Sequence, residues 1–335
     1  MRSLRSSLAA LSVVLLFSAC GPEPATGILF ETDMGNDVDD VIALDLVLKE
    51  CEKTGAQLLG VGTHRPGPTD APYVDMFLTW YGYPEIPIAE SQVLDTVLHA
   101  VPDYTAAVVP LADGDGKPLF ARSHQAYEEP VAMHRRLLAG RPDGSVVFLS
   151  TGFATELARL LESGPDGISP LSGRELVARK VKYLSIMCGS TRDDYSEFNV
   201  KNDIPAMRKV FSDWPTPVYV TPFEIGIISR YPAKVIEEDF SWAPAHPLVE
   251  AYKRYLPMPY DRPVWDVLAA AFIFHPEMFS VGPAGEFVID EEGCSRFVPK
   301  EGGSHYVLKL SKEQADALVA YMIAESTEQP ARCVR

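Results

Sequence analysis

Residues 27–40 read Gly27-Ile-Leu-Phe-Glu-Thr-Asp-Met-Gly-Asn-Asp-Val-Asp-Asp40, and the apolar run Val41-Ile-Ala-Leu-Asp-Leu-Val-Leu48 follows directly. The apolar residues 28–30 predict a buried strand, and residues 41–48 predict a buried helix. Four aspartates lie between these two elements: Asp33, Asp37, Asp39 and Asp40. Strand–turn–helix units of this kind, repeated along a chain, build a parallel sheet.

The four aspartates are too close together to be ionised at no cost. Like charges repel, so the cluster needs a cation, helix N–H groups or hydrogen-bonding ligands. Calcium accepts six to eight oxygen ligands, and open α/β sheets bind ligands at the carboxyl ends of their strands. A solvated turn is the alternative, and the buried elements on both sides argue against it. An EF-hand does not fit, because Leu44 would take the place of its bidentate Glu and no Gly holds its sixth position.

The rest of the chain repeats the same alternation of strands and helices. Strands are predicted at residues 27–31, 57–62, 145–150, 181–187 and 218–220. Helices are predicted near residues 40–50, 73–81, 130–139, 155–162 and 204–211. The fold class is therefore α/β, a Rossmann-like, open and mostly parallel sheet with helices on both faces. Residues 285–298 predict a late β-hairpin, and Ser311 with Gln314 predicts a capping box for a final helix.

Several segments resemble motifs of one enzyme family. Thr32-Asp33-Met-Gly35 through Asp39-Asp40 is similar to the amino-terminal signature of the inosine-uridine preferring nucleoside hydrolases, in a variant with two extra residues before the paired aspartates. Four further segments follow in the family's order: Ser150-Thr151-Gly152-Phe-Ala-Thr155, Ile186-Met187-Cys188-Gly189, Glu197-Phe198-Asn199 and Trp265-Asp266. The resemblance covers residues 27–325 and implies the nucleoside hydrolase fold.

The resemblance implies a calcium site. Asp33 would ligate Ca²⁺ and act as the general base toward a metal-bound water, and Asp40 would bind the ion through both carboxylate oxygens. Thr151 would contribute its backbone carbonyl, and Asp266 the remaining carboxylate. A bound cation lowers the pKa of its water, so a neighbouring carboxylate can generate the nucleophile at neutral pH.

The resemblance also implies a ribose site made of Asp39, Glu197, Asn199 and Asp266. Carboxylates around the sugar stabilise the positive charge that grows as an N-glycosidic bond breaks. They also accept hydrogen bonds from vicinal hydroxyls, which selects ribose over 2-deoxyribose. Asp37 lies in the two-residue expansion and receives no role.

The leaving-group side departs from the family pattern. Trp265 stands where many members have a His, and an indole can stack on a base without acting as its acid. His64 replaces an Asn of the family and is a candidate for the acid or a sugar contact. We place His64, Met187 and Trp265 in a candidate pocket for the base, whose identity the sequence does not give.

The amino terminus resembles a bacterial lipoprotein signal. Arg2 and Arg5 precede the apolar run 8–17, which is followed by Phe17-Ser-Ala-Cys20, and such a run is short for a permanent transmembrane helix. We predict a signal peptide at residues 1–19, lipidation of Cys20, a tether at 20–26, the hydrolase-like domain at 27–325 and a tail at 326–335. A plain secretory signal or an uncleaved anchor is the alternative.

Composition limits the partners. Without residues 1–19 the chain has 28 basic and 46 acidic residues, a formal net charge of −18. That charge argues against nucleic-acid polymers and anionic membrane surfaces, so the only membrane attachment expected is the lipid. An oxidising periplasm permits disulfides; Cys294 with Cys333 is a conceivable pair, and neither Cys51 nor Cys188 has metal-ligand spacing.

The sequence thus predicts a calcium-dependent N-ribohydrolase on the periplasmic side of a bacterial membrane, acting on a small nucleoside-like substrate. The family's habit of forming dimers and tetramers suggests a homo-oligomer. Two other interpretations stay open. One is a lipoprotein that binds calcium and ribose with little or no catalysis, and the other is a hydrolase of another ribosylated compound.

Overall fold

The computed structural model describes residues 25–65, 67–93, 103–192 and 194–333. The predicted signal peptide, Cys20 and most of the tether lie outside the described residues. In the described part of the chain, no helix is long and apolar enough to cross a membrane.

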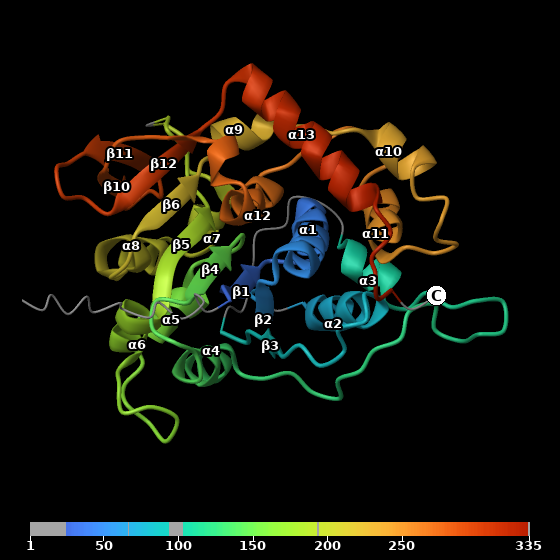
Figure 1. Ribbon diagram of the computed structural model, residues 1–335, viewed down its shortest axis with the longest axis horizontal. Helices are drawn as coiled ribbons and strands as arrows, with labels where there is room; N and C mark the ends of the chain where they lie inside the picture. The colour runs from blue at the N-terminus through green and yellow to red at the C-terminus, as the bar shows by residue number, and fades with distance from the viewer. Residues whose placement is uncertain (1–24, 66, 94–102, 193, 334–335) are drawn as a thin grey trace, which may run out of the picture.

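One sheet runs through the centre of the molecule (Figure 1). Its strands follow the order β11-β10-β12-β6-β5-β4-β1-β2-β3, and β9 pairs with β12 outside this path. The pairs from β6 through β3 are parallel, as is β12 with β6, whereas β9, β10 and β11 join antiparallel. The strand bounds are Gly27–Thr32 (β1), Gln57–Thr63 (β2), Ile88–Glu90 (β3), Val146–Ser150 (β4), Val181–Met187 (β5), Val218–Thr221 (β6), Ser280–Val281 (β9), Gly285–Ile289 (β10), Ser295–Pro299 (β11) and His305–Lys309 (β12).

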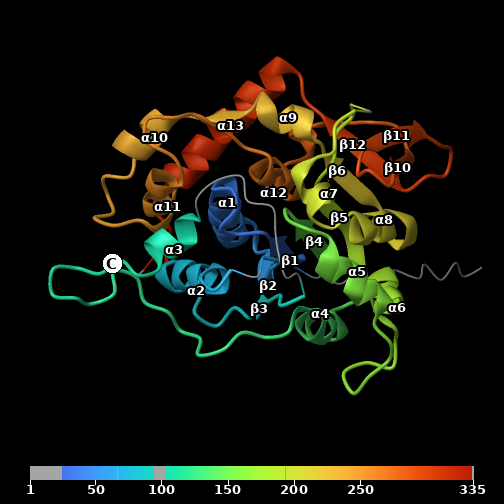
Figure 2. The same cartoon turned by 180° about the vertical axis from the view of Figure 1, so that it is seen from behind.

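Helices cover both faces of the sheet, and each face has its own hydrophobic core (Figures 1 and 2). The helices of one core are α1 (Asp39–Thr54), α2 (Asp70–Trp80), α3 (Tyr104–Val108), α11 (Pro247–Tyr255), α12 (Asp266–Phe274) and α13 (Lys312–Thr327). The helices of the other are α4 (Pro130–Ala139), α5 (Thr155–Glu162), α6 (Gly173–Lys180) and α8 (Ile204–Asp213). This arrangement confirms the predicted α/β sheet with helices on both faces.

The remaining elements are short and lie after β5. They are α7 (Phe198–Asn202), α9 (Phe223–Ile227), α10 (Ala233–Glu238), the 3₁₀ turn η1 (Pro276–Met278), and the two-stranded ribbon of β7 (Arg230–Tyr231) with β8 (Arg262–Pro263). Because β8 ends just before α12 begins, this ribbon positions the start of α12.

Burial explains why β1 is the central element. All six of its residues are buried, as expected for a strand paired on both sides in a parallel sheet. Its partners are β2 and β4, with Gly27 opposite Gln57 and Val146. The residues that follow β1 therefore emerge in the middle of the carboxyl edge of the sheet.

The carboxyl-terminal third confirms two predictions. The late hairpin is β10 with β11, and Ser311 with Gln314 forms a reciprocal capping box at the start of α13. The predicted domain end at residue 325 falls inside α13.

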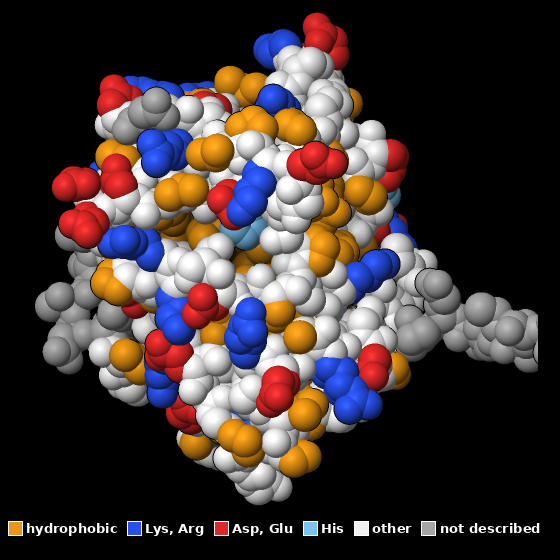
Figure 3. Space-filling view, turned by 90° about the vertical axis from the view of Figure 1, so that its left-hand side faces the viewer, with side chains coloured by type: hydrophobic (Ala, Val, Ile, Leu, Met, Phe, Trp, Pro, Cys, Tyr) orange, Lys and Arg blue, Asp and Glu red, His pale blue; other side chains and the backbone are white. Residues whose placement is uncertain are grey.

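Near the hairpin, basic and acidic side chains are interspersed rather than gathered by sign on the face shown in Figure 3.

Cys294 and Cys333 do not form the disulfide that the sequence left open. All four described cysteines are free. Cys294 lies in the turn before β11, whereas Cys333 follows α13 and contacts Gln329.

Candidate active site

A cavity of about 240 Å³ opens at the carboxyl edge of the sheet, where β1, β4 and β5 end and where α1, α7 and α12 begin. It contains most of the residues that the sequence proposed for the metal, the ribose and the base. Its lining consists of Asp33, Asn36, Asp37, Asp39, Thr151, Met187, Tyr195, Glu197, Phe198, Asn199, Phe223, Tyr255, Arg262, Trp265 and Asp266.

The first turn of α1 is tied to the first turn of α12 through Asp39. One oxygen of Asp39 accepts hydrogen bonds from the backbone N–H groups of Trp265 (2.7 Å) and Asp266 (3.1 Å). Acidic side chains are stabilised at helix N-termini by the N–H groups there. This bridge brings two segments more than 220 residues apart in the sequence to one site.

Asp40, a predicted metal ligand, is not in the cavity lining, and it connects the ends of β1 and β4. Its Oδ1 accepts hydrogen bonds from the hydroxyls of Thr32 and Thr151, the latter at 2.8 Å. Its side chain is fully buried, so the two hydroxyls fix the carboxylate next to Asp33.

Three of these carboxylates are left without full hydrogen bonding. One oxygen each of Asp33 (Oδ2), Asp39 (Oδ1) and Asp40 (Oδ2) is buried with no partner among the described residues. Burial raises the pKa of Asp33 to about 6. Burial, and then the neighbouring acids, raise the pKa of Asp39, Asp40 and Asp266 well above the ordinary value.

Unpartnered carboxylate oxygens are the chemistry that fits a hard cation. A divalent ion would satisfy these oxygens and lower the pKa of each acid again. In the described ranges, no three His, Cys, Asp or Glu side chains already stand together as a preformed metal site. The donor set therefore fits Ca²⁺ by its atoms, while metal binding itself remains a prediction.

Glu197 is held by backbone N–H groups. It is the N-cap of α7. Its carboxylate accepts hydrogen bonds from the N–H groups of Gly189 (3.0 Å), Asn199 (2.9 Å) and Val200 (3.4 Å). Burial nevertheless raises the pKa of Glu197 to about 7.

Asn199 is oriented by the carboxyl ends of two strands. Its Nδ2 donates to the backbone carbonyls of Thr151 and Met187, each at 3.1 Å. Since the amide nitrogen is used in this way, Oδ1 is the atom that remains to accept a hydrogen bond from a ligand.

The wall opposite the carboxylates is aromatic. The Trp265 ring stacks on Phe223, with centroids 5.6 Å apart and an interplanar angle of 24°. Its Nε1–H donates to the Phe223 carbonyl at 2.8 Å. The indole therefore has no free N–H to offer a ligand.

His64 is not in the lining, contrary to the prediction that placed it in the base pocket. It is buried, and its Nε2 lies 2.6 Å from Oε2 of Glu31. The other oxygen of Glu31 lies 2.6 Å from Nε2 of His134. The imidazole of His64 is thus engaged with a buried acid of β1.

Sequence reasoning missed Arg262 and gave no role to its partner Asp37. Arg262 donates from Nε to Oδ1 of Asp37 at 2.9 Å, and Nη2 also contacts this carboxylate. The signal was present, because Arg262 lies three residues before Trp265 in the same segment. The aromatic residues Tyr195, Phe223 and Tyr255 were also missed, since nothing local sets them apart from core residues.

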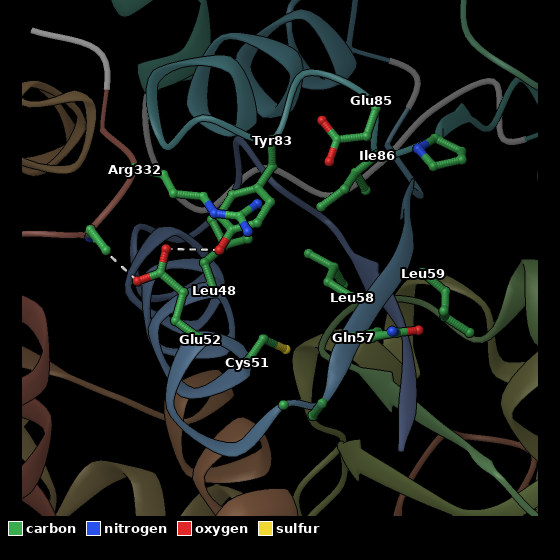
Figure 4. A pocket seen from close by; sticks show the side chains of 14 residues that line it. Leu48, Cys51, Glu52, Gln57, Leu58, Leu59, Tyr83, Glu85, Ile86 and Arg332 are labelled. Atoms are coloured by element: carbon green, nitrogen blue, oxygen red, sulfur yellow. Dashed lines mark hydrogen bonds between the residues drawn. The ribbon is translucent and has the colours of Figure 1, made fainter. Parts of the chain in front are cut away.

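A larger hollow of about 690 Å³ lies where α1 ends and β2 begins (Figure 4). Its polar groups pair with one another. Glu52 accepts from the Tyr83 hydroxyl (2.8 Å) and the Ala331 N–H (3.3 Å), and Arg332 lies over the Tyr83 ring. None of its lining side chains is among the described buried groups that lack a partner, so the smaller cavity is the better candidate.

Comparison with known proteins identifies the family. Residues 28–325 match the family described as inosine-uridine preferring nucleoside hydrolase. The chain belongs to this family. This nucleoside hydrolase is therefore an enzyme of the N-glycosidase class, whose members act on small nucleoside substrates. No curated protein sequence matches the chain.

Solved structures have the same fold. A purine-preferring ribonucleoside hydrolase from Gardnerella vaginalis matches with a TM-score of 0.68 at 15% identity, covering 90% of this chain and 99% of that one. An inosine-uridine preferring hydrolase from Bacillus anthracis matches with 0.64 at 18% identity, covering 90% and 99%. The type III effector XopQ, complexed with adenosine diphosphate ribose, matches with 0.65 at 16% identity, covering 92% and 96%. At such identities the likeness establishes the fold of this nucleoside hydrolase.

Proposed function

We propose that this enzyme hydrolyses the N-glycosidic bond of ribonucleosides, or of a related N-riboside, with Ca²⁺ held by Asp33, Asp40, Asp266 and the Thr151 carbonyl. The observation that carries the proposal is a set of buried carboxylate oxygens without a partner among the described residues: those of Asp33 and Asp39, which line the cavity, and that of Asp40, which adjoins Asp33. When bound, the ion supplies positive charge that lowers the pKa of a coordinated water.

Asp33 is the proposed general base. It lines the cavity at the end of β1, and one of its carboxylate oxygens has no partner among residues 25–65, 67–93, 103–192 and 194–333. In the absence of an ion its pKa is raised to about 6, so the carboxylate is ionised at neutral pH and can take a proton from water.

The ribose would lie against Asp39, Glu197, Asn199 and Asp266. Their oxygens accept hydrogen bonds from the sugar hydroxyls and stabilise the positive charge of the oxocarbenium-like transition state. A 2-deoxyribonucleoside would leave one buried acceptor unpaired, which is a strong basis for rejection. Trp265 and Met187 would contact the base.

A binding lipoprotein with slow catalysis is the second candidate. The favouring observation is that the indole N–H of Trp265 is committed to the Phe223 carbonyl and that His64 is engaged with Glu31. Neither group is free to protonate a leaving base.

We also propose that Cys20 carries lipid and anchors the enzyme on the periplasmic side of a bacterial membrane. The support is the sequence of residues 1–20 alone. Expression of the full chain and of Cys20→Ser, followed by membrane fractionation, tests it, since only the wild type should partition with membranes.

The test of the hydrolase is release of reducing sugar by a protein that begins at Gly21. Inosine, uridine, adenosine and cytidine are compared with their 2-deoxy forms, each with added calcium and with a chelator. We expect calcium-dependent release of ribose and little release from deoxy substrates. Binding of ribose without cleavage of any substrate would instead support the binding protein.

A further inference from the structure

Among the described residues that line the cavity, one has a cationic side chain. Arg262 lies in β8, four residues before Asp266. The other charged side chains of the lining are acidic: Asp33, Asp37, Asp39, Glu197 and Asp266. A guanidinium in such a site needs a role beyond balancing one acid.

Arg262 is fixed on several sides. Its Nε and Nη2 both bind the Asp37 carboxylate, and its Cζ lies 5.0 Å from the Tyr255 ring centroid and 5.4 Å from that of Trp265. Although burial opposes it, Asp37 holds the pKa of Arg262 above its ordinary value. Arg262 is therefore a permanent, oriented cation.

The ion pair with Asp37 leaves part of the guanidinium unused. Nη1, with two N–H groups, donates no hydrogen bond to another described residue, and it is not among the described atoms that are fully buried without a partner. A planar guanidinium presents such N–H groups in a fixed direction, which suits oxo and ring-nitrogen acceptors.

The reaction needs a group of this kind. When the bond from C1′ to the base nitrogen breaks, the electron pair stays on the base, which becomes negative unless it is protonated. The Trp265 N–H is engaged, and burial raises the pKa of Tyr195 and Tyr255, so these hydroxyls are weak proton donors. His64 binds Glu31 outside the lining.

We propose that Arg262 is a catalytic residue that stabilises the departing base as an anion, through hydrogen bonds from Nη1. This proposal rests on the proposed hydrolase function. The base leaves with the bonding pair and afterwards takes a proton from solvent, while C1′ takes hydroxide from a water whose proton goes to Asp33. Arg262 gives up no proton, so electrostatic stabilisation replaces acid catalysis.

The proposal defines a substrate class. The best substrates are neutral ribonucleosides whose base carries an oxo or ring-nitrogen acceptor that delocalises the negative charge. A ligand that is already anionic, such as a nucleoside phosphate, would meet five carboxylates and one guanidinium in the lining. Repulsion disfavours it.

The test compares two leaving groups. Inosine requires stabilisation of its base, whereas 4-nitrophenyl β-D-ribofuranoside releases a stable phenolate without help. Arg262→Gln should lower kcat/KM for inosine about 100-fold, which is the size of effect seen on removing one donor to a developing anion. The same substitution should lower kcat/KM for the nitrophenyl riboside less than about 3-fold. Asp37→Asn/Arg262→Gln, which keeps the net charge, should give the same pattern.

The controls separate the possible failures. Arg230→Gln, on the paired strand β7 and outside the lining, should leave both substrates unaffected. Retained cleavage of the nitrophenyl riboside shows that Arg262→Gln is folded. Equal losses on both substrates, or no loss on either, would overturn the role of Arg262. A wild-type protein that cleaves neither substrate contradicts the hydrolase function itself.

Discussion

Two acids on the same strand end, Glu31 and Asp33, are both buried and have opposite surroundings. Glu31 binds two imidazoles, those of His64 and His134, each at 2.6 Å. Burial alone would raise its pKa, but His134 and His64 lower the pKa of Glu31 to about 2. Asp33 has an oxygen without a partner in the part of the chain that the structure describes, and burial raises its pKa to about 6.

The comparison teaches that burial of an acid does not by itself mark a functional site. Glu31 has its counter-charge inside the protein, so it belongs to the structure of the sheet. Asp33, Asp39 and Asp40 lack such partners within the described residues, and desolvated charges without partners are expensive. The desolvation cost of these three carboxylates is explained if a ligand supplies the partners that the protein does not.

The largest expected effect comes from removing the charge of Asp33. Asp33→Asn should lower kcat for any cleaved nucleoside by at least about 10³-fold, or about 4 kcal/mol, because the general base is lost while the shape is kept. Steady-state kinetics measure the effect, and ribose binding should change little. Asp115→Asn, in an exposed loop, is the control; equal activity of both variants would refute the role of Asp33.

Substitution of Glu31 should change the stability of the protein rather than its catalytic rate. Glu31→Gln leaves His64 and His134 without their buried counter-charge, and we expect the free energy of unfolding to fall by about 3 kcal/mol. Urea unfolding measures it. The calcium effect described next should survive in this variant, so its loss would mean that the two acids are not separate in function.

Calcium should stabilise the wild type through the unpartnered acids. At about 100 times the dissociation constant, a ligand of the folded state adds about 2.7 kcal/mol to the free energy of unfolding. Thermal unfolding with calcium and with a chelator should show this increase, and Asp40→Asn should show little of it. An identical increase in Asp40→Asn would place the ion elsewhere.

The smallest effect concerns pH and Glu197. Because burial raises the folded-state pKa of Glu197 from 4.5 to about 7, the folded state binds this proton more tightly than the unfolded state does. The stabilising contribution is complete below pH 4.5 and is lost as pH rises through 7. In chelator, the stability of the wild type relative to Glu197→Gln should therefore fall by about 2 kcal/mol between pH 5.5 and pH 8. A pH-independent difference would contradict the raised pKa.

Much of the fold could be predicted, because its signals are local. The strands and helices that were predicted up to β6 lie where apolar runs and periodicity placed them, whereas α6 was not predicted, and the capping box at Ser311 marks the start of α13. Short elements such as β3, α3 and α7 escaped prediction, since few residues carry their pattern.

The sequence by itself determined the acid cluster after β1, the order of the family's motifs and therefore the class of enzyme. Only the tertiary structure decided which side chains have partners. It engaged His64 with Glu31, committed the Trp265 N–H to Phe223, and brought Arg262 to Asp37 across 225 positions of the chain. Such pairings depend on how strands and helices pack, and no local pattern encodes them. The type of a residue and its neighbours in the sequence indicate which reactions its side chain can support. Its partners in the folded chain determine whether that side chain is available to a substrate.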